Sequence, residues 1–178
     1  QPDIETPKAF FDAVSNFGKA VLEYAPSTGV ECYLEAVRDY YTNLGFPITC
    51  DDIMATHGGS EALEIIMSCI LEDGDEILIP EPFYPNYSTF VEITGASIRP
   101  IPTDPEKGYR YATREQIEPL INAHTRAILV TNPGNPTGVV LNHQEMRLLA
   151  DIAKEHGIFL ISDEVNREIV YTGEKLSS

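Results

Sequence analysis

Basic residues are scarce in this sequence of 178 residues. It contains 12 Lys and Arg residues against 28 Asp and Glu residues, which gives a formal net charge of −16 at pH 7. A surface this acidic repels nucleic acid and anionic membranes, so we exclude both as partners of the chain. An anionic ligand therefore needs local hydrogen-bond donors that offset the negative charge around it.

Cysteine and histidine are also few, and neither shows the spacing of a metal site. The three cysteines, an odd number, predict reduced thiols in a cytoplasmic protein rather than a disulfide framework. Cys69 lies within the apolar run from Ile65 to Leu71, so we expect it in the core. The four histidines form no zinc-type cluster, and we predict no metal site.

Long apolar runs are absent as well. No stretch approaches the length of a transmembrane helix, and the first residues lack the pattern of a signal peptide. The hydrophobic content of 43% is ordinary for a globular protein and allows a sizeable core. We therefore predict one globular domain over residues 1–178.

Predicted helices and strands alternate along the chain. Helical spacing of apolar residues or helix-capping signals predict helices over residues 9–23, 30–44, 62–71, 86–94, 114–123 and 142–156. Short apolar runs predict strands over residues 53–56, 76–80, 97–102, 127–130 and 158–161. Such alternation is typical of an α/β fold with a mainly parallel sheet.

The loop from Asn132 to Gly138 contains two prolines, two glycines and two asparagines. Proline fixes φ and glycine admits positive φ, so this loop is stiff and specifically shaped. It follows the predicted strand at residues 127–130, and open α/β sheets build ligand sites at the carboxyl ends of their strands. By itself the loop is equally consistent with a tight connection that only turns the chain.

Three more loops follow predicted strands and share the same edge of a parallel sheet. Residues 58–62 (GGSEA) open a helix whose backbone N–H groups suit a phosphate, residues 82–84 (PFY) carry aromatic rings, and Asp163 supplies a carboxylate. Each motif alone also fits a structural role. Together with the amides of Asn132 and Asn135, they suit a flat heterocycle that bears a phosphate and a protonatable nitrogen.

Five motifs in order along the chain resemble one family. They are residues 24–29 (YAPSTG), 58–63 (GGSEAL), 82–84 (PFY), 132–138 (NPGNPTG) and 162–165 (SDEV). The chain resembles the pyridoxal-phosphate-dependent aminotransferases of class I and II, which have fold type I. The resemblance implies part of a three-layer αβα large domain, pyridoxal 5'-phosphate as cofactor, and amino transfer from an amino acid to a 2-oxo acid.

The resemblance also implies a role for individual residues. Backbone N–H groups of Gly59, Ser60 and Glu61 would hold the cofactor phosphate, and Tyr84 would stack on the pyridine ring. Asp163 would pair with the ring nitrogen and keep it protonated, which strengthens the ring as an electron sink.

The phenolic oxygen of the cofactor and its phosphate would receive further contacts. Asn135 would donate a hydrogen bond to the phenolic oxygen. Asn166 stands where the family usually has a tyrosine that bonds the same oxygen, and its shorter side chain would lose that contact or make it through water. Tyr24 resembles the tyrosine that reaches the phosphate of the neighbouring subunit, which implies a homodimer.

The family's Schiff-base lysine has no counterpart in this sequence. The five lysines lie outside a Ser-x-x-Lys segment, and Lys175 reads as part of a solvated turn. We expect a partial large domain without the N-terminal segment, the lysine region and the small C-terminal domain. The chain alone would then be inactive, would contain no catalytic residue, and would bind the cofactor weakly or not at all.

Two other functions remain open at this point. The same loops would serve a pyridoxal-phosphate-dependent lyase or synthase of the same fold, because they bind the cofactor rather than select the reaction. An aminotransferase-like ligand-sensing domain of a transcriptional regulator would also carry them. We further expect the chain to self-associate, because an incomplete sheet exposes an unpaired edge.

Overall fold

The computed structural model describes residues 3–169 and residue 171. The chain forms two compact units, residues 1–55 and residues 56–178, which we call the N-terminal unit and the C-terminal unit. That both belong to a single domain stays a prediction. Within the described residues, no helix has the length and apolar character needed to cross a membrane.

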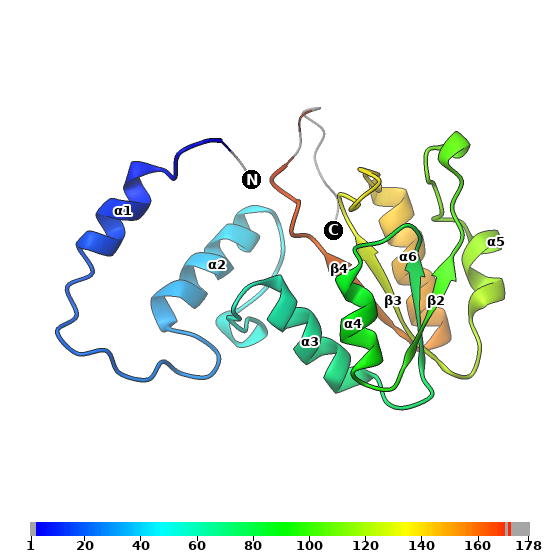
Figure 1. Ribbon diagram of the computed structural model, residues 1–178, viewed down its shortest axis with the longest axis horizontal. Coiled ribbons are helices and arrows are strands. Elements are labelled where there is room, and N and C mark those ends of the chain that lie inside the picture. The colour runs from blue at the N-terminus through cyan, green and yellow to red at the C-terminus, as the bar shows by residue number, and fades with distance from the viewer. Residues whose placement is uncertain (1–2, 170, 172–178) are drawn as a thin grey trace. The chain divides into compact units, whose positions relative to one another are not determined.

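The N-terminal unit contains helices α1 (Lys8–Ser15) and α2 (Glu31–Asn43) and the 3-10 turn η1 (Cys50–Asp52) (Figure 1). The prediction of a helix over residues 30–44 is confirmed by α2. The prediction over residues 9–23 is too long, because α1 ends at Ser15 and Asn16 caps its last turn. None of the residues of α1 is buried, and a short helix without packing partners is only marginally stable.

Residues 53–56 do not form the predicted strand. A strand is stable only when a neighbouring strand accepts and donates its backbone hydrogen bonds. Here the N–H of Ala55 donates to the carbonyl of Thr28 at 2.8 Å, and that loop continues no ladder. The segment therefore enters the C-terminal unit as irregular chain.

The C-terminal unit is an open sheet with helices on both faces (Figure 1). Its strands are β1 (Glu76–Pro80), β2 (Ser97–Ile101), β3 (Thr125–Thr131) and β4 (Phe159–Asp163). Its helices are α3 (Gly59–Ile70), α4 (Asn86–Glu92), α5 (Arg114–Ile117) and α6 (His143–His156), with 3-10 turns η2 (Pro105–Lys107) and η3 (Glu118–Leu120). All neighbouring strands are parallel, in the order β2-β1-β3-β4, which confirms the predicted parallel sheet.

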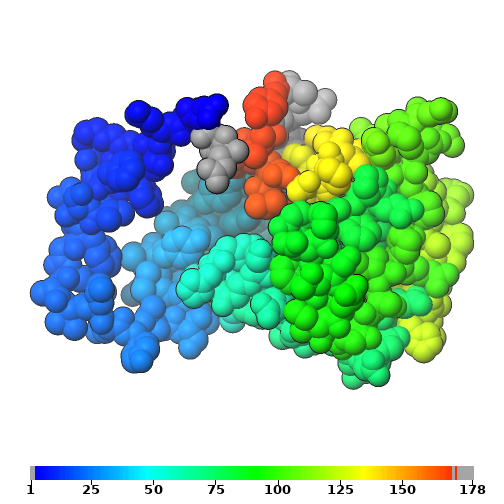
Figure 2. All heavy atoms as spheres, viewed as in Figure 1, coloured from blue at the N-terminus to red at the C-terminus, as the bar shows by residue number. Residues whose placement is uncertain are grey.

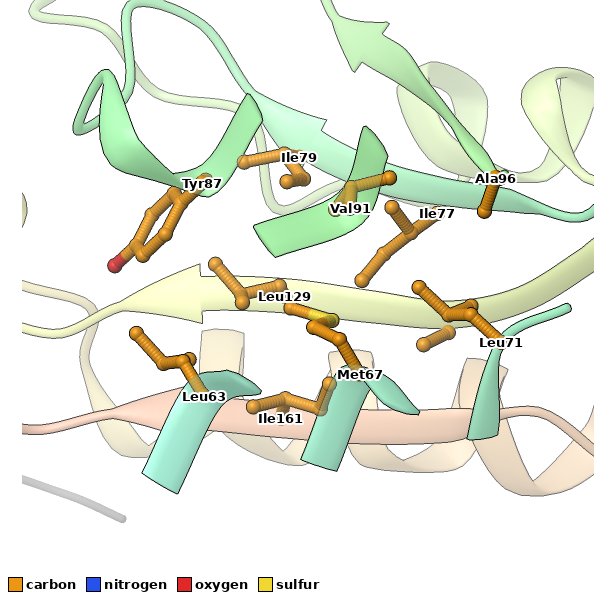
Figure 3. Packing of buried hydrophobic residues seen from close by; sticks show 11 residues of the cluster. Leu63, Met67, Leu71, Ile77, Ile79, Tyr87, Val91, Ala96, Leu129 and Ile161 are labelled. Carbon is orange, nitrogen blue, oxygen red and sulfur yellow. The ribbon is translucent and has the colours of Figure 1, made fainter. Parts of the chain in front are cut away.

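The side chains of β1 and β3 alternate between two buried clusters, one on each face of the sheet. Ile77, Ile79 and Leu129 pack with α3 and α4, as Figure 3 shows. Leu78 and Ile128 belong to the other cluster, which includes residues of α5 and α6. Because both faces are covered, the strands read as continuous apolar runs, and the three-layer αβα architecture is confirmed.

Two predictions in this unit are wrong. Cys69 is exposed rather than part of the core, because the buried stripe of α3 runs through Leu63 and Met67, and Cys69 lies about 200° around the helix from Met67. The helix predicted over residues 114–123 is shorter: α5 gives way to η3, where Pro119 has no N–H to continue the ladder. Lys175 lies outside the described residues.

Candidate active site

The loop after β3 is held in place by its first asparagine. The side chain of Asn132 is 2% exposed, and its Oδ1 accepts a hydrogen bond from the N–H of Leu141 at 3.0 Å. Its own N–H donates to the carbonyl of Asp163 at 2.9 Å, which ties the end of β3 to the end of β4. Asn132 is therefore a structural residue, whereas Asn135 in the same loop is exposed to solvent.

The same loop closes on itself around Gly134. The N–H of Gly134 donates to the carbonyl of Val139 at 2.8 Å, and the N–H of Gly138 donates back to Gly134 at 2.9 Å. A Cβ at position 134 would come within 2.8 Å of Oγ1 of Thr137. A larger residue would require the Thr137 side chain to shift, so the loop presents Asn135 on a tight turn.

The carboxylate of Asp163 stands at the carboxyl end of β4 and is held by two donors. The N–H of Val165 donates to Oδ1 at 3.1 Å, and the hydroxyl of Tyr87 donates to Oδ2 at 2.6 Å. The same hydroxyl lies 2.7 Å from Oγ1 of Thr131 at the end of β3. Burial and the bond to Asp163 raise the pKa of Tyr87 well above its usual value, so its phenol stays neutral.

Tyr84 lies beside this network. Its ring meets that of Tyr87 edge to face, with centroids 5.5 Å apart and an interplanar angle of 84°. Its hydroxyl accepts a hydrogen bond from the amide of Asn86 at 2.8 Å. The ring of Tyr84 is half-buried, so the loop between β1 and α4 offers one aromatic side chain at the edge of the sheet.

The N-terminus of α3 points toward the same edge. In Figure 3, Leu63 of α3 lies at the end of the cluster where β3 terminates and where the hydroxyl of Tyr87 emerges, whereas Leu71 lies at the opposite end. No side chain among the described residues caps this helix, and a Cβ built on Gly58 or Gly59 would meet nothing within 4 Å. The start of α3 is thus exposed at Gly58, Gly59 and Ser60, without a side-chain cap among the described residues.

The side chain of Glu61 reaches back to His57, two residues before the start of α3. Its Oε2 accepts the backbone N–H of His57 at 2.5 Å and lies 2.9 Å from Nδ1 of the His57 ring. These two contacts hold the pKa of Glu61 below its usual value. The carboxylate is thereby occupied by His57, while the backbone N–H of Glu61 remains in the first turn of α3.

The segment after β4 packs on the loop after β3, as the adjoining yellow and orange atoms in Figure 2 show. The amide of Asn166 donates to the carbonyl of Pro133 at 3.3 Å. Glu164 pairs with Arg167 at 2.5 Å and accepts from Ser162. Asn166 and Glu164 thus serve to fix this segment around Asp163.

Comparisons with known proteins agree with this geometry. The sequence profile of the family "Aminotransferase class I and II" matches residues 3–177. The chain belongs to this aminotransferase family. It is 32% identical over 179 aligned positions to a probable aspartate/prephenate aminotransferase of Thermus aquaticus, covering 99% of this chain and 46% of that relative.

Solved aminotransferase structures share the fold. The aromatic aminotransferase from Pyrococcus horikoshii superposes with a TM-score of 0.92 at 29% identity, over 100% of this chain and 48% of that one. The Thermus thermophilus aspartate aminotransferase with maleate superposes with a TM-score of 0.89 at 31% identity, over 99% of this chain and 47% of that one. The chain thus spans about half the length of the aminotransferases it matches.

The C-terminal unit brings most of the predicted site residues of this chain to one sheet edge. Gly59, Ser60 and Glu61 open α3, Tyr84 follows β1, Asn135 follows β3, and Asp163 and Asn166 follow β4. Tyr24 belongs to the N-terminal unit, between α1 and α2, where its side chain is fully exposed. The assigned roles of these residues stay predictions.

Two residues of the edge were missed by the sequence reasoning. Tyr87 and Thr131 bond each other, and Tyr87 bonds Asp163, from positions 44 and 76 residues away along the chain. A tyrosine in the first turn of a helix normally indicates core packing, and Tyr87 is indeed fully buried. Its hydroxyl partner is visible only once the fold brings the side chain of Tyr87 to the end of β4.

Proposed function

We propose that this chain is the cofactor-binding part of an aminotransferase that uses pyridoxal 5'-phosphate to move an amino group from an amino acid to a 2-oxo acid. One observation carries the proposal most directly. The carboxylate of Asp163 lies at the same sheet edge as the uncapped N-terminus of α3, so a negative charge and an anion-binding helix end share one site.

The residues of that edge fit the cofactor. Asp163 is a carboxylate whose two oxygens each accept a hydrogen bond, so it is held in place to pair with a protonated ring nitrogen. The N–H groups of Gly59, Ser60 and Glu61 would hold the phosphate. These donors would offset the repulsion between the phosphate and a chain with a net charge of −16. When bound, the cofactor supplies an electron sink for the bond changes at the amino-acid carbon.

The remaining side chains would orient the ring. Tyr84 would stack on its face, because its half-buried ring stands at the rim of the same edge. Asn135 would donate to the phenolic oxygen from its exposed position on the preformed loop. Asn166 already donates one N–H to Pro133, so it would reach that oxygen only with its second amide hydrogen or through water.

The assembly and its location are part of the proposal. Tyr24 would reach the phosphate of a neighbouring subunit, and its full exposure leaves it available for that contact in a homodimer. The three cysteines are free thiols, which favours the reducing cytoplasm. Relatives named as aspartate, prephenate and aromatic aminotransferases make amino acids and 2-oxo acids the proposed substrate classes.

A titration with pyridoxal 5'-phosphate tests the cofactor site. We expect the absorbance of the cofactor to change on binding, with a dissociation constant at or below the millimolar range. Asp163→Asn should weaken binding about tenfold or more, because it removes the charged partner of the ring nitrogen. Asp151→Asn, which makes the same change at an exposed ion pair on α6, is the matched control and should bind as the wild type does.

Two results would count against the site. One is an unchanged absorbance even at millimolar cofactor. The other is an equal affinity of the Asp163 and Asp151 variants. Pyridoxal, which lacks the phosphate, should bind more weakly than the phosphate ester if the N-terminus of α3 contributes.

A further inference from the structure

The environment of Asp163 contains a chain of hydroxyl groups. Tyr87 has one hydroxyl proton, and the carboxylate of Asp163, which can only accept, takes it at 2.6 Å. The contact of 2.7 Å between Tyr87 and Thr131 then has one direction, with the hydroxyl of Thr131 donating to the oxygen of Tyr87. Donation runs from Thr131 to Tyr87 to Asp163.

The series of hydroxyl groups that ends on Asp163 comes from Thr131 of β3 and Tyr87 of α4. Tyr87 is fully buried on α4, and its ring contacts the rings of both Phe83 and Tyr84. Figure 3 shows its ring among the core side chains and its hydroxyl directed out of the cluster. This packing fixes the ring of Tyr87 and holds its hydroxyl against Asp163.

The two oxygens of Asp163 are thus fixed from two directions. Oδ2 is held by a side chain of α4 and Oδ1 by the backbone N–H of Val165. A carboxylate with donors on both oxygens is restrained in its rotation about the Cβ–Cγ bond. Each oxygen can still accept a further hydrogen bond, because a carboxylate has about four acceptor sites.

We propose that Tyr87 and Thr131 are positioning residues that hold the carboxylate of Asp163 in the orientation in which it can accept a hydrogen bond from the ring nitrogen of pyridoxal phosphate. This inference rests on the proposed function, since it concerns the same cofactor site. Neither residue needs to touch the cofactor. They act through Asp163, and their effect is on the protonation state of the bound ring rather than on the fold.

The test uses four variants with a built-in rescue. Tyr87→Phe keeps the buried ring and removes the hydroxyl, and Thr131→Val removes the first donor of the chain. Thr131→Ser restores a hydroxyl at that position. Thr125→Val, at the opposite end of β3, is the control, because Thr125 is the other threonine of this strand and its hydroxyl accepts the N–H of Asn122 instead.

The first readout needs no cofactor. In a chain labelled with 13C at aspartate carboxyl carbons, the signal of Asp163 is assigned with Asp163→Asn. We expect it to move in Tyr87→Phe, to move less in Thr131→Val, and to stay in place in Thr131→Ser and Thr125→Val. An Asp163 signal identical in all four variants would overturn the inference.

The second readout is the ring nitrogen of added 15N-labelled pyridoxal 5'-phosphate. We expect a protonated nitrogen with the wild type, a shift toward the unprotonated signal with Tyr87→Phe, and an affinity lower by about three- to tenfold. Wild-type behaviour of Tyr87→Phe would make Tyr87 a packing residue only. If the wild type itself bound no cofactor, the proposed function would fail, while the 13C signal would still decide the link between Tyr87 and Asp163.

Discussion

The hydroxyl of Tyr87 donates to Oδ2 of Asp163 across 2.6 Å, joining the first turn of α4 to the carboxyl end of β4. The two residues are 76 positions apart in the chain, and the sheet order β2-β1-β3-β4 brings them together. The site of this aminotransferase relative therefore depends on tertiary structure as much as on its sequence motifs.

Alkaline pH should destabilise the chain through Tyr87. Burial and Asp163 raise the pKa of Tyr87 above its ordinary value of about 10. Above that pH the unfolded chain releases a phenol proton that the folded chain keeps. Stability is therefore fully present below pH 10 and falls as the pH rises further, by up to about 1.4 kcal/mol per pH unit for this group.

Urea unfolding between about pH 9 and about pH 11 measures this loss. Tyr111, whose pKa burial also raises, should contribute a similar decrease. Tyr87→Phe should show a shallower fall of unfolding free energy with pH than the wild type. Equal slopes in the two proteins would contradict a buried neutral phenol at position 87.

Asn132→Ala should cost more stability than Asn135→Ala. The change at Asn132 leaves the buried N–H of Leu141 without its acceptor, which costs about 1–3 kcal/mol. Asn135 is exposed, so its replacement should change the free energy of unfolding by less than about 0.5 kcal/mol. Denaturant titrations of both variants check this, and equal losses would show that Asn132 does not anchor the loop.

Asn142→Ala should loosen the start of α6. The side chain of Asn142 accepts the N–H groups of Gln144 and Glu145 at 2.9 and 3.0 Å, and Glu145 bonds back to the N–H of Asn142. Loss of this capping box should cost about 1 kcal/mol in thermal or urea unfolding. The exposed change Gln144→Ala is the control, and a comparable cost there would argue against a capping role.

The C-terminal unit could be read largely from the sequence. The runs at residues 76–80 and 127–130 are apolar throughout, which indicates strands covered on both faces, and β1 and β3 match them. Asn142 as a helix cap predicted the start of α6 correctly, because a cap is a local interaction. Features that depend on a local cap or on the burial pattern of a single strand were therefore predictable.

The N-terminal unit could not be read in the same way. Apolar spacing from Phe10 to Leu22 favours a helix, but spacing does not say whether a partner covers that face. In the structure Phe10 and Leu22 are exposed, and the helix ends at Ser15. The roles of Tyr87 and Thr131 were missed for a related reason, since both depend on contacts between distant segments.

Self-association should occur at high protein concentration through apolar residues of the N-terminal unit. Phe10, Phe11 and Val14 of α1 are 58%, 56% and 60% exposed, and clustered apolar surface of this kind promotes contacts between chains. Light scattering should give a mass that rises with concentration. Replacing all three with Ser should lower it, and Asp12→Ser should not; a clean monomer throughout would contradict the prediction.

The central claim is that one sheet edge of the C-terminal unit binds pyridoxal 5'-phosphate, and amide chemical shifts test it most directly. A 15N-labelled chain is titrated with the cofactor and its N–H signals are followed. We predict changes at Gly59, Ser60 and Glu61 and at residues 163–166, with none at Asp75 or Thr125 at the opposite ends of the strands. Shifts confined to other surfaces, or no shifts at saturating cofactor, would contradict the account.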